Sequence, residues 1–111
     1  GPPQFGGPGD VWSPETLLVG AVADCFILSF RAIARKAKLD WVTIECDVDG
    51  ELDKLDGLTQ FTAFTTKATL TISDEKYLKK AEVILEKAEK YCLVTNSMKA
   101  NSHLETNVLV S

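Results

Sequence analysis

The longest apolar stretch of the chain lies near its start and predicts a central helix. The tripeptide Ser-Pro-Glu at 13–15 is a typical helix beginning: Ser caps helices, Pro is favoured at the first helical position, and Glu suits the positive end of the macrodipole. Between positions 17 and 30 only Asp24 and Ser29 are clearly polar. A helix that is apolar on all sides is either buried or spans a membrane. The central Asp24 and the basic run at 31–38 favour a buried central helix.

Alternation of apolar and polar residues predicts strands after this helix. Within 41–48, the even-numbered positions Val42, Ile44, Cys46 and Val48 share one face, and the polar residues between them share the other. The segment 59–72 is rich in Thr and Phe and predicts a long strand. Asp-Gly pairs at 49–50 and 56–57 predict turns.

The second half of the chain predicts a further helix and a final strand. Ser-Asp at 73–74 caps a helix over 75–91, whose apolar stripe runs on to Cys92 and whose charged face is solvated. A short helix is expected over 93–100 and a strand over 104–110. This order predicts an α+β fold with a mostly antiparallel sheet. One further long helix and a few strands are too few to surround the central helix. We therefore expect a second copy of the chain to cover part of it.

Length and composition bound the classes of protein. The 111 residues suit one domain over 1–111, and residues 1–12 form a loop by composition, with four of the seven Gly and three of the four Pro. The net charge of −4 argues against a nucleic-acid binder. The chain begins with neither Met nor a signal peptide, which leads us to expect a cytoplasmic protein, either processed or part of a longer chain.

The three cysteines are the candidate reactive residues of the chain. Their odd, low number excludes a disulfide-stapled scaffold, and the lack of a Cys-x-x-Cys motif, with His103 the single histidine, gives no support for a metal site. Cys46 alternates with aliphatic residues and reads as a buried, inert thiol. Cys25 and Cys92 each fit a core position or a reactive one. The two sulfurs meet only if their helices pack together.

Two runs of sequence resemble the signatures of the OsmC/Ohr family. The run at 12–26 has a Pro-Glu that opens an apolar helix, with Cys25 ten positions after Glu15. The run at 88–97 has an Ala shortly before Cys92, followed by Val, a hydroxyl residue and Asn. The spacing of 67 positions between the cysteines and the Asp-Gly turn at 56–57 also suit the family.

The resemblance implies an OsmC-like fold, an intertwined homodimer, and a thiol-dependent peroxidase that reduces organic hydroperoxides. By resemblance Cys25 is the peroxidatic cysteine, Cys92 is the resolving cysteine, and Glu15 belongs to the catalytic network. The family uses no metal or organic cofactor, and an external dithiol reduces the oxidised enzyme. No nucleic-acid or membrane partner is implied.

The chain departs from the family pattern in ways that keep an alternative open. The family's N-terminal β-segment, with its catalytic Arg, is absent; Leu93 stands where Pro is common, and Asp24 stands where small residues are usual. The alternative is a non-catalytic OsmC-like dimer that serves as a scaffold or binds a small apolar molecule. An acidic neighbour such as Asp24 raises a thiol pKa, which favours this alternative.

Helix geometry limits which groups can assist Cys25. A buried thiol needs a nearby cation to become a thiolate, but Arg31 lies about 9 Å along the same helix axis and cannot sit beside it. Glu15 lies about 15 Å away along a continuous helix. We therefore expect either that Glu15 serves a site shared between subunits or that it only stabilises its own helix terminus.

Overall fold

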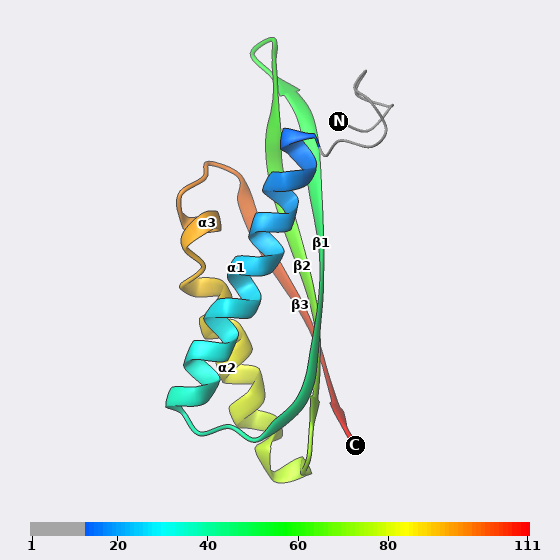
Figure 1. The fold of residues 1–111 in the computed structure, drawn as a ribbon. Coiled ribbons are helices and arrows are strands. Elements are labelled where there is room, and N and C mark those ends of the chain that lie inside the picture. The colour runs from blue at the N-terminus through cyan, green and yellow to red at the C-terminus, as the bar shows by residue number, and fades with distance from the viewer. Residues whose placement is uncertain (1–12) are drawn as a thin grey trace.

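The computed structural model describes residues 13–111, which form three strands and three α-helices (Figure 1). The expected loop at 1–12 lies outside the described residues. In chain order the elements are α1 (Pro14–Lys36), β1 (Trp41–Leu55), β2 (Leu58–Ile72), a 3₁₀ turn η2 (Glu75–Tyr77), α2 (Leu78–Lys90), α3 (Leu93–Asn96) and β3 (Asn101–Val110). The α+β class is confirmed.

The sheet is mixed and its strand order is β1-β2-β3. The long β1 and β2 pair antiparallel through a tight turn, in which Asp56 and Gly57 have φ of 52° and 80°, as a two-residue hairpin requires. β3 pairs parallel with β2, because α2 and α3 return the chain to the opposite end of the sheet before β3 begins. The expected turn at 56–57 is therefore confirmed.

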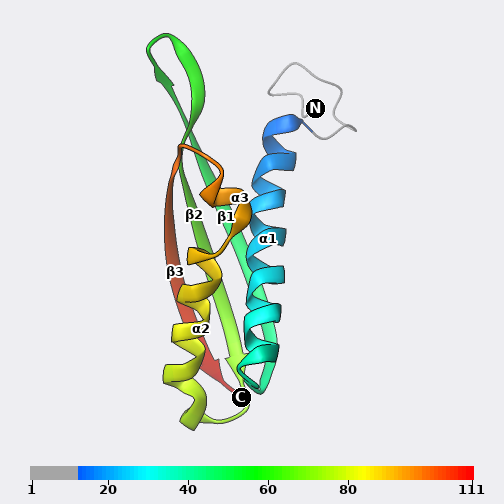
Figure 2. The same cartoon turned by 90° about the vertical axis from the view of Figure 1, so that its left-hand side faces the viewer.

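The helices lie on one face of the sheet, with α1 over the β1 side and α2 over the β3 side (Figure 2). The opposite face of β1 and β3 is exposed and mostly polar, with Leu109 of β3 as an apolar exception. On β1 it presents Glu45 and Asp47, as the alternation predicts, and on β3 it presents His103 and Glu105. Only the helix-covered face therefore contributes to the hydrophobic core.

Local signals at both ends of α1 explain its bounds. Ser13 is the N-cap, and its Oγ accepts a hydrogen bond of 3.1 Å from the Thr16 N–H, which satisfies one of the free amides of the first turn. At the other end Lys38 adopts a left-handed φ of 56°, and the Leu39 N–H donates to the Ala34 carbonyl at 2.9 Å. This closing bond is the Schellman arrangement that ends many helices.

The core is built on one stripe of α1. Val22, Phe26, Phe30 and Ala34 recur every four residues and are all buried. Phe26, Phe30 and Ala34 form one cluster with the inner face of β2 and the apolar side of α2, and the Phe30 ring meets Trp41 edge-on, with centroids 5.3 Å apart.

One copy of the chain buries only this stripe of α1. On the outer side of the helix Leu17 and Leu28 are 58% and 57% exposed. By length and composition α1 is the one helix within 13–111 that could cross a membrane, a test that core helices of soluble proteins also pass. Its packing against the sheet confirms the expected central helix, but burial on all sides is not achieved within one chain.

Three sequence expectations need correction. The expected turn at 49–50 is wrong, because β1 continues to Leu55 and Gly50 pairs with Phe64 inside the strand. Gly50 is needed for another reason: a Cβ there would lie 2.8 Å from the ring of Phe61. The helix over 75–91 begins as the η2 turn, and the short helix over 93–100 ends at Asn96, which lets β3 begin at Asn101.

Phe30→Ala tests the core. Removing this fully buried ring leaves a cavity against Trp41, so we expect the free energy of unfolding, measured by urea denaturation, to fall by about 3–5 kcal/mol. Val83→Ala on the outer side of α2, where Val83 is 42% exposed, is the control and should cost less than about 1 kcal/mol. Equal losses for the two variants would contradict this assignment of the core.

Candidate active site

The candidate site is the meeting point of Cys25 and Cys92. Cys25 is half-buried midway along α1, on the flank of the buried stripe, while Cys92 is 2% exposed and is the N-cap residue of α3. α3 packs against α1 (Figure 2), and the Cys92 thiol lies near enough to Cys25 to lower the pKa of Cys25. Both thiols are reduced. The fold thus brings together two cysteines that are 67 positions apart in the chain.

Four neutral donors surround the Cys25 sulfur. Burial alone raises the pKa of this thiol, because it disfavours the charged thiolate. The backbone N–H groups of Val94 and Leu93, the Cys92 thiol and the Ser29 hydroxyl lie around Cys25 as possible donors, and together they lower its pKa by more than burial raises it. The net result is a pKa below the usual value for a cysteine, so a thiolate forms more readily here.

The expected cation is not what lowers this pKa. Arg31 and Arg35 are exposed, and neither contributes to the shift at Cys25. Asp24 is exposed as well and does not contribute, although it precedes Cys25 in sequence. Within the described chain the thiolate is therefore favoured by neutral hydrogen-bond donors, which need no counter-charge.

Cys46 differs from Cys25 although it also lies near Cys92. It is half-buried on the inner face of β1, opposite Ala68 on β2. Burial first, and then the negative charge of Asp47 and the proximity of Cys92, raise the pKa of Cys46 to about 11. Cys46 therefore stays protonated at neutral pH and is a poor nucleophile.

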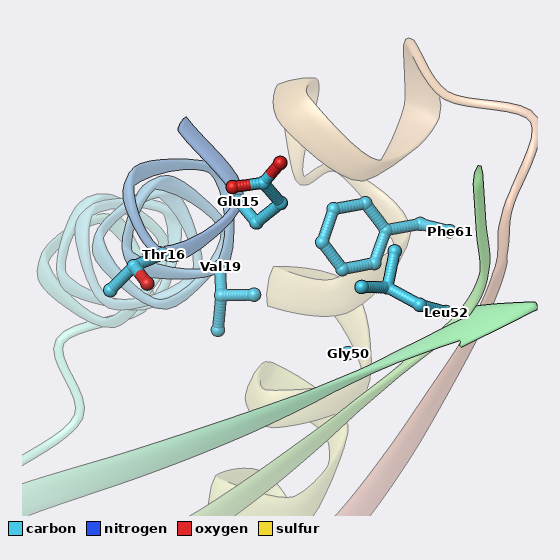
Figure 3. A pocket seen from close by; sticks show the side chains of 6 residues that line it. All are labelled: Glu15, Thr16, Val19, Gly50, Leu52 and Phe61. Atoms are coloured by element: carbon cyan, nitrogen blue, oxygen red, sulfur yellow. The ribbon is translucent and has the colours of Figure 1, made fainter. Parts of the chain in front are cut away.

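Glu15 lies apart from Cys25 and Cys92. It lines a cavity of about 210 Å³ between the first turns of α1 and the β1–β2 hairpin, where Glu15 and Val19 face Leu52 and Phe61 (Figure 3). The helix is continuous from Pro14 to Lys36, so Glu15 is about 15 Å along the axis from Cys25 of the same chain. A single chain thus pairs Cys25 with Cys92 and leaves Glu15 beside an apolar pocket.

Sequence reasoning found some of these groups and missed others. The spacing of four residues between Cys25 and Ser29 marks them as neighbours on one helix face, and the Ser29 hydroxyl is among the groups that lower the pKa of Cys25. The amides of Leu93 and Val94 carry no residue-specific signal, because every residue except proline has an N–H. The departure at Leu93 was a clue, since a proline there would lack this donor.

No group of three or more His, Cys, Asp or Glu side chains within residues 13–111 is arranged to hold a metal ion. The functional groups that the described site offers are its two thiols and the hydrogen-bond donors around them.

Comparisons with known proteins identify the family to which this α+β fold belongs. The family model for OsmC-like proteins matches residues 7–107. An uncharacterised protein of Bacillus subtilis, YmaD, is 20% identical over 98% of this chain and 75% of its own length. The chain belongs to the OsmC-like family, as its two signatures indicate.

Solved structures share the fold at low sequence identity. An OsmC-like protein of unknown function from Vibrio cholerae has a TM-score of 0.81 at 24% identity, over 96% of this chain and 73% of the other. An organic hydroperoxide resistance protein OsmC from Legionella pneumophila has a TM-score of 0.75 at 23% identity, over 98% and 77%. An organic hydroperoxide resistance protein from Elizabethkingia anophelis has a TM-score of 0.77 at 18% identity, over 100% and 78%.

Leu93→Pro tests the role of the backbone donors. Leu93 is the first residue of α3 and is 73% exposed, and Cys92 before it is extended (φ −66°, ψ 108°), so a proline fits and removes little except the N–H. One hydrogen bond to a charged acceptor contributes about 1.5 kcal/mol, so alkylation of Cys25 at pH 7 should slow about tenfold and its pH profile should move to higher pH.

The control for this experiment is Leu93→Ala, which keeps the N–H and should retain the profile of the unmodified protein. Peptide mapping after iodoacetamide treatment assigns the label to Cys25, and Cys46 should stay unlabelled until the pH approaches its raised pKa of about 11. Identical profiles for the two Leu93 variants would mean that this amide does not stabilise the thiolate.

Proposed function

We propose that the protein is a cytoplasmic, thiol-dependent peroxidase that reduces organic hydroperoxides. The observation that carries the proposal is the contact between Cys25, whose pKa is lowered, and the thiol of Cys92. A peroxidase of this kind needs a thiolate to attack the peroxide and a second thiol within bonding reach to form a disulfide. Family membership and the names of the structural relatives support the same chemistry.

The proposed reaction begins at the Cys25 sulfur. The thiolate attacks the terminal oxygen of the hydroperoxide, the O–O bond breaks, and the alkoxide leaves and takes up a proton to become an alcohol. Cys25 is then a sulfenic acid. The Cys92 sulfur attacks this sulfenic acid, an S–S bond forms, and the hydroxyl leaves as water with the proton of the Cys92 thiol. An external dithiol reduces the disulfide by exchange and is itself oxidised.

A homodimer completes this proposal. The outer side of α1 exposes Leu17 and Leu28, and near the site Tyr91 and Leu93 are 59% and 73% exposed. Apolar side chains exposed along one helix and beside a reactive thiol favour cover by a second copy of the chain. Such cover would exclude water from Cys25 and provide an apolar wall for an organic substrate.

Glu15 belongs to this proposal only through the partner subunit. Its cavity combines an acidic group with the apolar side chains of Val19, Leu52 and Phe61, which suits the organic part of a hydroperoxide. Glu15 cannot reach Cys25 along its own helix, so in the proposed enzyme each site combines Cys25 and Cys92 of one subunit with Glu15 of the other.

The alternative is a non-catalytic dimer that binds a small apolar molecule. The cavity beside Glu15 favours it, since an apolar pocket with one polar group is typical of ligand sites. The lowered pKa of Cys25 favours the enzyme, because an inert buried thiol would have a raised pKa, as Cys46 has.

Cysteine variants test the peroxidase. With cumene hydroperoxide and dihydrolipoamide, Cys25→Ser should abolish peroxide consumption, because no thiolate remains to attack. Cys92→Ser should consume about one equivalent of peroxide and then stop at the sulfenic acid, detected by mass spectrometry with dimedone. Cys46→Ser is the matched control and should keep full turnover. Full activity in Cys25→Ser, or no consumption by the unmodified protein, would favour the non-catalytic alternative.

Mixed dimers test the shared site. Subunits carrying Cys25→Ser and subunits carrying Glu15→Gln, each with a different affinity tag, are refolded together and the mixed dimer is purified through both tags. If each site combines Cys25 and Glu15 from different subunits, the mixed dimer has one intact site and should regain about half of the unmodified activity. Activity no higher than that of the Glu15→Gln dimer would place Glu15 outside the site of the partner.

A further inference from the structure

The turn that carries Cys92 is tied together by hydrogen bonds on both sides of the cysteine. The Cys92 N–H donates to the Glu89 carbonyl at 3.2 Å. The Cys92 carbonyl accepts from the Asn96 N–H at 3.0 Å and from the buried Thr95 hydroxyl at 3.2 Å. Both backbone polar groups of Cys92 are therefore held, one by the end of α2 and the other by α3.

A side chain closes the same turn across the cysteine. The Asn96 side-chain amide donates to the Lys90 carbonyl at 2.9 Å, so it links a residue after Cys92 to one before it. Ser97 makes a similar bond to the Leu93 carbonyl at 2.8 Å, but this bond lies wholly after Cys92. Asn96 thus links the residues on the two sides of Cys92, whereas Ser97 does not.

α3 packs against α1, and three of the four groups that lower the pKa of Cys25 belong to this turn: the Cys92 thiol and the amides of Leu93 and Val94. α3 has only four residues, which is far too short to be stable as an isolated helix. The direction of these three donors must therefore be fixed by other contacts, and the side chains of Thr95 and Asn96 supply them.

We propose that Thr95 and Asn96 are positioning residues that hold the Cys92 turn against Cys25, and so set both the acidity of Cys25 and the ease of its pairing with Cys92. The inference rests on the proposed function, because it assigns these residues a part in the same thiol chemistry. Neither side chain hydrogen-bonds to a sulfur; each acts through the backbone of the turn.

Matched variants separate positioning from folding. Thr95→Val keeps the shape of the side chain and removes the hydroxyl, whereas Thr95→Ser keeps the hydroxyl. Asn96→Ala removes the bridge to Lys90, and Ser97→Ala removes a hydrogen bond of the same kind that does not bridge Cys92. Circular dichroism and thermal melting check that all four variants are folded.

Two readouts follow the thiol pair and need no peroxide. The first is the pH profile of Cys25 alkylation. The second is the equilibrium constant of the Cys25–Cys92 disulfide in glutathione buffers, which measures how readily the two sulfurs meet. Thr95→Val and Asn96→Ala should each slow alkylation at pH 7 about three- to tenfold, because misaligned donors stabilise the thiolate less, and should lower the disulfide constant by a similar factor.

Thr95→Ser and Ser97→Ala should match the unmodified protein in both readouts. The proposal is overturned if Thr95→Val and Asn96→Ala also match it, or if Thr95→Ser is impaired as much as Thr95→Val. Since neither readout involves a substrate, a protein that consumes no hydroperoxide would refute the peroxidase while leaving the positioning role to be decided by these measurements.

Discussion

The rotational setting of α1 is the constraint on which the site depends. Val22, Phe26, Phe30 and Ala34 fix that setting, because all four lie on the buried stripe of the helix, and the last three pack against β2 and α2. Cys25 and Ser29 lie one position before two of these residues, so they come to the flank of the stripe, beside α3. A helix rotated by one residue would bury Cys25 in the core or turn it to solvent, away from Cys92. The hydrophobic core therefore determines which groups can approach the sulfur.

Much of this arrangement could be predicted from the sequence, because it follows from local rules. The Ser-Pro-Glu beginning of α1, the alternation of β1 and the Asp-Gly turn at 56–57 each reflect the behaviour of a few neighbouring residues. The turn expected at 49–50 failed because the same dipeptide serves a tertiary need at that point: Gly50 makes room for an aromatic ring from the neighbouring strand. Only the packing of distant residues distinguishes the two cases.

In the candidate site, too, some features follow from local sequence and others only from the packing of distant residues. Two signatures in the sequence mark Cys25, Cys92 and Glu15, and the spacing of four residues marks Ser29 as a neighbour of Cys25. The pattern led us to look for a cation, since electrostatic attraction is the usual way to acidify a buried thiol. The structure uses backbone amides instead, and amides are invisible in a sequence because their direction depends on the path of the chain. Leu93 is a partial exception, because a proline at this position would have no N–H. Its exposed side chain contributes less to the site than its backbone N–H does.

Gly50 links the width of the cavity beside Glu15 to a single backbone position. The residue lies on the cavity wall, and any side chain there would push against the ring of Phe61, which forms another part of the same wall. A mutation at this position would therefore both fill space and displace an aromatic neighbour, so it would change the shape of the cavity abruptly. Val19 and Leu52 line the same cavity from α1 and β1 with aliphatic side chains of adjustable size (Figure 3). Differences in cavity size among relatives of this chain should thus accumulate at those two aliphatic positions, with the glycine left as it is.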